Sequence, residues 1–351
     1  MADKLAGWAD PNGDAESLFW FFRGRSVLVT GGTGSFGRAF VAAMLRHGRP
    51  RRLAIFSRDE MKQVEMEREM SPLDRDGSLR FFIGDVRDQR RLVMALRGIE
   101  LVVHAAALKQ VPVAEYNPFE CIHTNVLGAE NVVQAAIETN VERVIALSTD
   151  KAANPINLYG ASKLAADKIF VAANHLSGST GPRFSIVRYG NVLGSRGSVI
   201  PMFRQLVAAG ARELPITDPR MTRFWITMNQ GVAFVASCME TMRGSEIFVP
   251  KIPSMTIVAL AEAIAPGVPH KIVGVRPGEK LHEVMITTDD ARTTRDLGDR
   301  YLIAPAISLG NAGELLAQGS AVPDDFRYAS DTNDRWLTRE SLLTLIRAKD
   351  E

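Results

Sequence analysis

A glycine-rich segment directly after the first predicted strand constrains the fold more than any other feature of this sequence. Residues 30–37 read Thr-Gly-Gly-Thr-Gly-Ser-Phe-Gly and follow an apolar run. Glycines allow a tight turn and let the backbone approach a pyrophosphate, and the helix that follows offers free N–H groups to that anion. The segment predicts a dinucleotide-binding site. Its expected contacts are Gly31, Thr33, Gly34, Ser35, Phe36 and Gly37.

Short apolar runs alternate with helical patterns from Arg25 onward. This alternation is typical of an α/β fold with a Rossmann-type, doubly wound parallel sheet. The predicted strands are Ser26–Thr30, Arg52–Phe56, Leu79–Ile83, Leu101–Ala105, Arg143–Ser148 and Phe184–Arg188. The predicted helices are Gly37–His47, Asp59–Met70, Gln89–Arg97, Pro118–Thr139 and Leu158–His175.

The sequence divides into three predicted parts. Residues 1–24 read as an N-terminal extension, residues 25–190 as the Rossmann domain, and residues 191–351 mainly as a smaller substrate-binding part. Within the last part we expect a loop-rich stretch from Ser195 to Trp225, a helix at Asn229–Thr241, and a strand near residues 246–249 that returns to the Rossmann sheet.

The end of the second predicted strand bears on which dinucleotide binds. Enzymes that use NAD commonly place a carboxylate here, whereas those that use NADP place cations near the extra phosphate. Ser57 and Arg58 end this strand, and Lys62 lies one helical turn further on. Arg58 can present a guanidinium fork to a phosphate. We therefore predict NADP as the cofactor, with a solvated cation at the start of a helix as the alternative, because Asp59 and Glu60 add negative charge.

Later strand ends supply further predicted cofactor contacts. In open α/β sheets, ligands bind at the carboxyl ends of the strands. The third and fourth predicted strands are followed by short segments that suit an adenine contact and the passage of a dinucleotide backbone. These predicted contacts are Asp85, Val86, Ala105 and Ala107.

Tyr159 and Lys163 lie four residues apart and hence on one face of the predicted helix. A nearby ammonium favours the phenolate, so the tyrosine can take a hydroxyl proton while hydride leaves the same carbon. This pair, with the T-G-x-x-G-x-x-G spacing of the glycine segment, resembles the short-chain dehydrogenases. The resemblance implies that Tyr159 and Lys163 contact the cofactor and that Thr149 hydrogen-bonds the reacting carbonyl oxygen.

Asp150 and Lys151 follow Thr149 at the end of the fifth predicted strand. They add a carboxyl and an amine to the same crevice, which a simple dehydrogenase or a 4-epimerase does not need. A reaction that oxidises C4 of a sugar, removes the C5 proton and expels the C6 hydroxyl needs such an extra acid and base. The alternative is structural, with Asp150 as a helix cap and Lys151 exposed.

Residues 148–161, Ser-Thr-Asp-Lys-Ala-Ala-Asn-Pro-Ile-Asn-Leu-Tyr-Gly-Ala, resemble the signature of the inverting UDP-N-acetylglucosamine 4,6-dehydratases that begin pseudaminic acid biosynthesis. The resemblance extends from Ser26 to about Trp336. It implies that Lys151 abstracts the C5 proton, that Asp150 protonates the leaving C6 oxygen, and that Tyr159 with Lys163 serves C4 oxidation by a recycled NADP. Glucose-nucleotide dehydratases carry Asp-Glu where this chain has Asp-Lys.

A UDP-sugar needs cations, a few polar groups and apolar walls in its pocket. The predicted substrate contacts lie in segments that resemble the family. They are Lys109, Asn191, Arg196, Thr217, Arg223, Arg276 and Glu279. For each arginine, a surface or structural role is an equal alternative.

Composition argues against a nucleic-acid-binding protein, a cysteine-based metal site and a membrane-spanning protein. The 42 Lys and Arg nearly balance the 40 Asp and Glu, so a broadly basic surface for nucleic acid is not indicated. The two cysteines form no paired metal motif, and no apolar run reaches membrane-spanning length. We expect a cytoplasmic protein without a metal that acts on a UDP-sugar, and the resemblance implies a homo-oligomer. The alternatives are a UDP-sugar 4-epimerase, a retaining dehydratase, or a catalytically silent NADP sensor.

Overall fold

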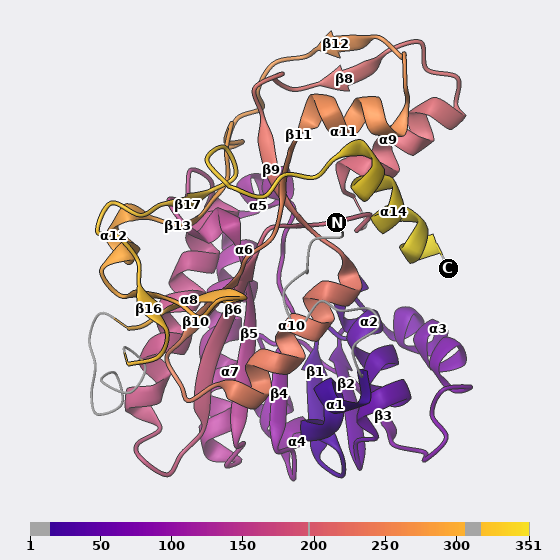
Figure 1. Cartoon of the computed structure of the whole chain (residues 1–351). Coiled ribbons are helices and arrows are strands. Elements are labelled where there is room, and N and C mark those ends of the chain that lie inside the picture. The colour runs from indigo at the N-terminus through magenta and orange to yellow at the C-terminus, as the bar shows by residue number, and fades with distance from the viewer. Residues whose placement is uncertain (1–14, 196, 306–316, 351) are drawn as a thin grey trace.

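The computed structural model describes residues 15–195, 197–305 and 317–350 and has a ten-stranded sheet at its centre (Figure 1). In spatial order its parallel strands are β3 (Leu79–Ile83), β2 (Arg52–Ser57), β1 (Ser26–Thr30), β4 (Leu101–His104), β5 (Arg143–Thr149), β6 (Arg183–Tyr189) and β10 (Ile247–Pro250). Antiparallel strands continue the sheet, namely β15 (Arg300–Ile303), β14 (Thr294–Asp296) and β16 (Ser320–Ala321). The Rossmann-type parallel sheet confirms the predicted fold class.

The strands predicted between Ser26 and Arg188 all form, each within one residue of its predicted bounds. β1 and β4 are buried along their whole length, whereas β3 is partly exposed because it lies at the sheet edge. Strands covered on both faces read as continuous apolar runs, which explains why they were recognisable.

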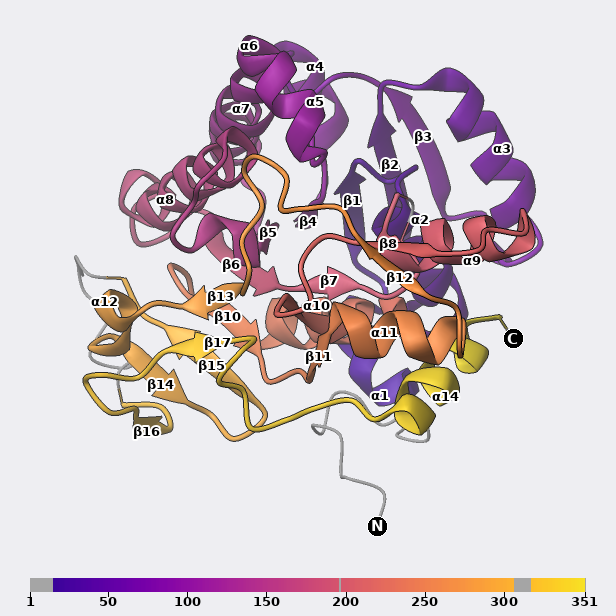
Figure 2. The ribbon, with the colours of Figure 1, turned by 90° about the horizontal axis from the view of Figure 1, so that it is seen from above.

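Helices cover both faces of the sheet (Figure 2). One group comprises α4 (Gln89–Leu96), α7 (Gly128–Glu138) and α8 (Leu158–Leu176). The other comprises α2 (Ser35–Ala43), α3 (Glu60–Met70) and α10 (Met228–Thr241). Two predicted helices are interrupted by π-helical turns. Helix α2 continues into a π-helix at Met44–Gly48. The helix predicted at 118–139 is divided into α6 (Pro118–Ile122), a π-helix at His123–Leu127, and α7.

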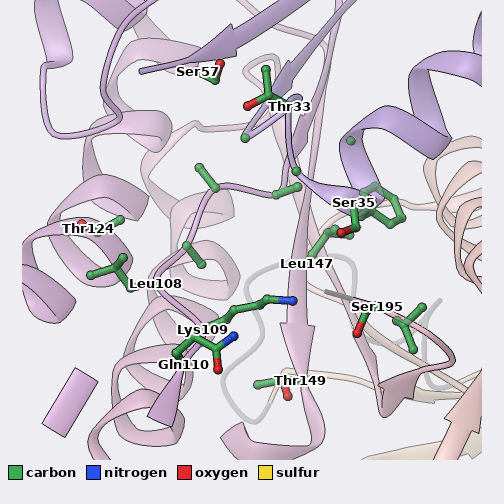
Figure 3. A pocket seen from close by; sticks show the side chains of 18 of the residues that line it. Thr33, Ser35, Ser57, Leu108, Lys109, Gln110, Thr124, Leu147, Thr149 and Ser195 are labelled. Atoms are coloured by element: carbon green, nitrogen blue, oxygen red, sulfur yellow. The ribbon is translucent and has the colours of Figure 1, made fainter. Parts of the chain in front are cut away.

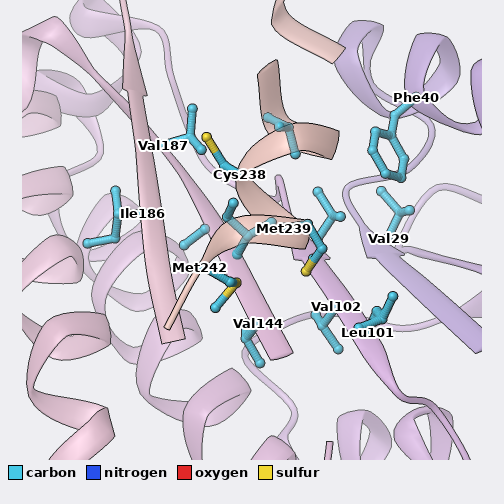
Figure 4. Packing of buried hydrophobic residues seen from close by; sticks show 14 of the residues in the cluster. Val29, Phe40, Leu101, Val102, Val144, Ile186, Val187, Cys238, Met239 and Met242 are labelled. Atoms are coloured by element: carbon cyan, nitrogen blue, oxygen red, sulfur yellow. The ribbon is translucent and has the colours of Figure 1, made fainter. Parts of the chain in front are cut away.

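Apolar side chains fix α10 on the sheet. Cys238 and Met239 of α10, with Met242 just beyond it, lie over strand residues such as Val102 and Val144 (Figure 4). All five side chains are buried. The short segment α1 (Ala15–Phe19) and the 3-10 turn Trp20–Phe22 add Phe19 and Phe22 to this core. The described end of the predicted N-terminal extension thus packs against the core of the Rossmann sheet.

A second, smaller hydrophobic core lies in the C-terminal half of the chain. It involves α9 (Val199–Ala208), β8 (Leu214–Ile216), β9 (Thr222–Ile226), β11 (Ser254–Thr256), α11 (Ile257–Ile264) and α14 (Arg339–Asp350). The stretch predicted as loop-rich from Ser195 to Trp225 thus holds a helix and two strands, and that prediction was wrong. Ile200, Phe203 and Trp225 are buried here because they face this second core, a long-range contact that local composition does not reveal.

The remaining elements are short. They are α5 (Val111–Tyr116), the 3-10 turn Asp150–Ala152, β7 (Asn191–Val192), β12 (His270–Ile272), β13 (Val284–Ile286), α12 (Thr288–Ala291) and β17 (Tyr328–Ala329). β13 pairs with β17, and β12 with β8. None of the helices within the described ranges combines the length and the apolar character needed to cross a bilayer.

Candidate active site

A cavity of about 630 Å³ opens at the carboxyl ends of the parallel strands. Lys109 extends into it from the loop after β4, and Ser35 and Thr149 belong to other parts of its wall (Figure 3). The cavity brings together most of the predicted site residues. Those that line it are Gly31, Thr33, Gly34, Ser35, Phe36, Gly37, Ser57, Arg58, Lys62, Asp85, Val86, Ala105, Ala107, Lys109, Thr149, Lys151, Tyr159, Lys163 and Asn191.

The glycine segment brings backbone atoms unusually close together. Gly31 has φ +64°, and a Cβ there would lie 2.8 Å from the backbone N of Ala106. A Cβ on Gly37 would lie 2.4 Å from the carbonyl oxygen of Gly32. Only glycine fits these positions without displacing backbone. The resulting turn ends at Gly34, the N-cap of α2, so the helix N-terminus faces the cavity and fits a dinucleotide pyrophosphate.

The two predicted phosphate cations lie at the cavity wall, each beside a carboxylate. The guanidinium of Arg58 is 3.6 Å from Asp85, and the amine of Lys62 is 2.7 Å from Asp59. Both cations are about half exposed, so their ion pairs are weak and can rearrange. Arg58 and Lys62 are therefore free to turn toward an incoming anion.

Lys151 lies between two carboxylates. Its Nζ atom is 3.1 Å from Oδ1 of Asp150 and 3.1 Å from Oε1 of Glu283. Thr149 donates a hydrogen bond of 2.9 Å to the same Asp150 oxygen. Asp150 and Glu283 are almost completely buried, whereas Lys151 is partly exposed to the cavity. The cavity thus meets this charged cluster through the amine.

The three charges change one another's acidity. Burial, followed by repulsion from Glu283, raises the pKa of Asp150 although Lys151 opposes the change. Burial alone would lower the pKa of Lys151, but Asp150 and Glu283 raise it above its usual value. Burial would likewise raise the pKa of Glu283, yet Lys151 and Arg223 lower it on balance. Lys151 is hence an ammonium at neutral pH, and Asp150 is the carboxyl that binds a proton more readily.

Tyr159 and Lys163 start helix α8, whose N-cap Asn157 accepts a hydrogen bond from the Gly160 N–H. A Cβ at residue 160 would lie 2.3 Å from the Lys151 carbonyl oxygen, so glycine lets the helix contact the Asp150–Ala152 turn. Burial raises the pKa of Tyr159 to about 12 and lowers the pKa of Lys163. The Lys163 amine donates a hydrogen bond of 2.7 Å to the Leu147 carbonyl.

Several predicted substrate residues lie apart from the described lining of this cavity. Thr217, Arg223, Arg276 and Glu279 are not among its lining residues, and Arg196 lies outside the described residues. The buried Arg223 guanidinium donates to the carbonyls of Thr222, Lys280 and Leu281, while that of Arg276 is mostly exposed. Their roles as substrate contacts stay predictions.

Glu283 is the site residue that sequence reasoning missed. It lies 132 positions after Lys151, and only the fold brings the two together. The family-like segment from Arg276 to Ile286 contains it, which is the one signal that could have pointed to it. The cavity wall also includes residues that the sequence did not predict, among them Gln110, Thr124, Tyr189, Ser195 and Ser198. Among the described residues, no group of three or more His, Cys, Asp or Glu side chains is placed to hold a metal ion.

Comparisons with known proteins agree with these features. Residues 27–305 match the family described as polysaccharide biosynthesis protein. A Campylobacter jejuni protein named UDP-N-acetylglucosamine 4,6-dehydratase (inverting) is 53% identical over 331 residues, which cover 93% of this chain and 98% of the relative. A Rickettsia canadensis protein named UDP-glucose 4-epimerase is 40% identical over 344 residues, covering 94% and 98%.

A solved structure is also similar. It is DesIV, a dTDP-glucose 4,6-dehydratase from Streptomyces venezuelae with NAD and TYD bound. The TM-score is 0.65 at 26% sequence identity, over 73% of this chain and 86% of that chain. Together, these similarities confirm the resemblance indicated by the sequence motifs.

Proposed function

The chain belongs to the polysaccharide biosynthesis protein family, and we propose that it is a UDP-N-acetylglucosamine 4,6-dehydratase that inverts C5. The observation that carries the proposal is that Lys151, in contact with Asp150, lines the same cavity as Tyr159 and Lys163. The residues for oxidation and the additional base thus share one cavity, and the buried Asp150 contacts that base. The product is UDP-2-acetamido-2,6-dideoxy-β-L-arabino-hexos-4-ulose, and the proposed role is the first step of pseudaminic acid biosynthesis for surface or flagellin glycosylation.

The cavity fits a nicotinamide dinucleotide, and NADP is the proposed form. When bound, the nicotinamide supplies reversible hydride transfer, so the cofactor is recycled in each turnover and the net reaction is that of a hydro-lyase. Gly31, Gly34 and Gly37 leave room for the pyrophosphate. Arg58 and Lys62 are the cations for the additional phosphate.

Tyr159 takes the proton of the C4 hydroxyl, and Thr149 hydrogen-bonds the oxygen that becomes the ketone. Both side chains line the cavity, as this role requires. The phenol has a pKa of about 12 in the protein alone, because burial disfavours the phenolate. Positive charge from Lys163 and from the oxidised nicotinamide favours the phenolate. Ligand binding is therefore part of the activation of Tyr159.

Asp150 and Lys151 carry out the elimination. Proton transfer from the Lys151 ammonium to the Asp150 carboxylate, across 3.1 Å, breaks one N–H bond and forms one O–H bond. This single step leaves a neutral amine and a carboxylic acid side by side. The amine then takes the C5 proton, which is acidic because C4 is a ketone, and the acid protonates the departing C6 hydroxyl.

The remaining cavity accommodates the UDP-sugar. Lys109 and Asn191 line it directly, and Lys109 extends an amine into it (Figure 3). The amine of Lys151 also lies 3.5 Å from the Asn191 side-chain oxygen, which places Asn191 beside the proposed base. Arg196, Thr217, Arg223, Arg276 and Glu279 remain proposed substrate contacts, and a homo-oligomer remains the proposed assembly.

Incubation with UDP-N-acetylglucosamine and NADP in deuterium oxide tests this function. NMR of the product should show a 4-keto-6-deoxy sugar with deuterium at C5 and the L-arabino configuration. Absorbance of NADPH should not accumulate with product, because hydride removed from C4 returns to C6. A D-configured product contradicts inversion, and steady NADPH formation contradicts the recycled cofactor.

A UDP-sugar 4-epimerase is the second candidate, because the Rickettsia relative carries that name. It shares the need for Tyr159 and Lys163 but has no use for an acid and a base at C5 and C6. The same NMR experiment distinguishes the two. An epimerase converts the substrate into its C4 epimer, retains the C6 hydroxyl and incorporates no deuterium at C5.

A further inference from the structure

Glu283 is a buried carboxylate that contacts the proposed base from another part of the chain. It is 1% exposed, and its Oε1 atom lies 3.1 Å from Nζ of Lys151. We infer that Glu283 is a positioning residue that fixes the Lys151 amine and sets how readily that amine gives up its proton. This inference rests on the proposed function, since it concerns the same acid-base pair.

The backbone around Glu283 is held on both sides. Its N–H donates a hydrogen bond of 2.9 Å to the hydroxyl of Ser330, and its carbonyl accepts one of 2.8 Å from the Ser330 N–H. Arg223 donates to the carbonyls of Lys280 and Leu281, just before Glu283. The carboxylate is thereby presented to the base in a fixed orientation.

The charged surroundings of Lys151 come from several elements. Asp150 belongs to its own turn, and Glu283 approaches from the segment before β13. Arg223 of β9 lies 3.7 Å from Glu283, and the charge of Lys280 also acts on this cluster, while the neighbouring phenol of Tyr159 is neutral. Glu283 and Asp150 are the carboxylates in direct contact with the amine. Loss of the Glu283 charge therefore leaves the cations less opposed and lowers the basicity of Lys151.

The charge changes of the elimination show what Glu283 contributes. Before it, Asp150 is protonated, Lys151 is neutral and Glu283 is anionic. Afterwards Asp150 is anionic, Lys151 is an ammonium, and Glu283 is unchanged. A fixed anion next to the amine stabilises the ammonium as the C5 proton arrives, and it orients Nζ toward the cavity. Glu283 itself does not touch the substrate in this scheme.

Competitive labelling of lysines measures the effect without any need for turnover. Acetic anhydride reacts with the neutral amine, and peptide mass spectrometry quantifies Lys151 relative to Lys109, which lines the same cavity. In Glu283→Gln the pKa of Lys151 should fall by about one unit or more, so labelling at one fixed pH should be roughly tenfold faster. The matched control is Asp289→Asn, an exposed carboxylate in α12 that should leave the ratio unchanged.

Turnover provides the second readout. Glu283→Gln should lower kcat by roughly 10²-fold through misplacement of the amine, with KM for UDP-N-acetylglucosamine within about threefold. Its activity should rise at lower pH than in the wild type. Glu283→Asp keeps the charge, and its Lys151 labelling should stay near the wild-type value.

Two results would overturn the inference. One is an unchanged Lys151 labelling ratio in folded Glu283→Gln, and the other is a reduced kcat with a wild-type pH profile. Failure of the wild type to dehydrate UDP-N-acetylglucosamine instead overturns the proposed function. The labelling comparison still tests the link between Glu283 and Lys151 in that case.

Discussion

Asp167 of α8 and Arg188 of β6 form a buried ion pair in which the two side chains are 3.2 Å apart. Asp167 lies one helical turn after Lys163 and accepts a 2.8 Å hydrogen bond from Ser148. Arg188 of β6 also donates to the carbonyl of Met285, two residues after Glu283. The pair therefore joins α8, β6 and β13, three elements that position the site.

Asp167→Asn should strongly destabilise the fold, because within the described part of the chain the buried Arg188 guanidinium then keeps just the more distant Asp290 carboxylate, 3.9 Å away, as an ionic partner. Removal of one partner of a buried pair typically costs about 3–5 kcal/mol. Urea unfolding followed by circular dichroism measures the change. Glu213→Gln, which removes a mostly exposed partner of Lys271, should cost less than about 1 kcal/mol. Equal stabilities of the two variants contradict the prediction.

His104 should make stability depend on pH below about 6.5. It is buried at the end of β4 with Nδ1 2.8 Å from the Thr30 hydroxyl, and burial lowers its pKa to about 3. The folded protein keeps it neutral, so the unfolded chain binds the extra proton as pH falls. Stability from this group is fully present above pH 6.5 and is lost toward pH 3, by about 1.4 kcal/mol per pH unit.

Urea midpoints of wild type and His104→Gln between pH 7 and 5 test this dependence. The difference between the two proteins should change with pH, because glutamine does not titrate. His175→Gln, at an exposed position near the end of α8, is the matched control and should follow the wild type. Parallel pH curves for the wild type and His104→Gln contradict the prediction.

The strands of the parallel sheet could be predicted because burial on both faces leaves a continuous apolar run in the sequence. β1 and β4 show this directly. Helix α9 could not be predicted in the same way. Its buried residues Ile200 and Phe203 face a small core made with nearby β8 and with α11 and α14, which are distant in sequence.

The site residues differ in the same way, because some belong to local motifs and others depend on long-range contacts. Gly31 and Tyr159 belong to local sequence motifs that predicted them as site residues, and both line the cavity. Glu283 depends on a contact between distant segments. Arg223 shows the converse difficulty, since its cationic side chain suggests a phosphate ligand, yet it donates to backbone carbonyls beside Glu283. Sequence pattern identifies charge but not the direction in which a side chain points.

Arg58→Ala should erode a preference for NADP over NAD. Arg58 lies at the cavity wall, and its ion pair with Asp85 is partly exposed and can open. Loss of a charge-assisted bond to phosphate costs about 1.5–3 kcal/mol, or roughly 10- to 100-fold in affinity for NADP. Calorimetric titration with NADP and with NAD measures the two affinities in the wild type and the variant. Arg68→Ala, at the far end of α3, is the control. Equal affinity of the wild type for NAD and NADP contradicts the assignment.

Lys151→Ala should bind UDP-N-acetylglucosamine and NADP but fail to exchange the C5 hydrogen or release water. The variant removes the amine that lies between Asp150 and Glu283, and the second oxygen of each carboxylate has no hydrogen-bond partner among the described residues. Its loss can therefore also lower stability. The double variant Lys151→Ala/Glu283→Gln removes one of the two negative charges and is the folding control. Calorimetry reports binding, and NMR in deuterium oxide reports exchange.

Asp150→Asn should keep the geometry of the turn, because its side-chain oxygen can still accept from Thr149 and Lys151. An amide can neither take the Lys151 proton nor protonate the C6 oxygen, so elimination should slow by at least roughly 10²–10⁴-fold, the usual contribution of a general acid. Oxidation at C4 depends on Tyr159 and Lys163 and should be less affected. If Lys151→Ala and Asp150→Asn both retain wild-type turnover, the two residues are structural, and elimination must use other groups of the cavity.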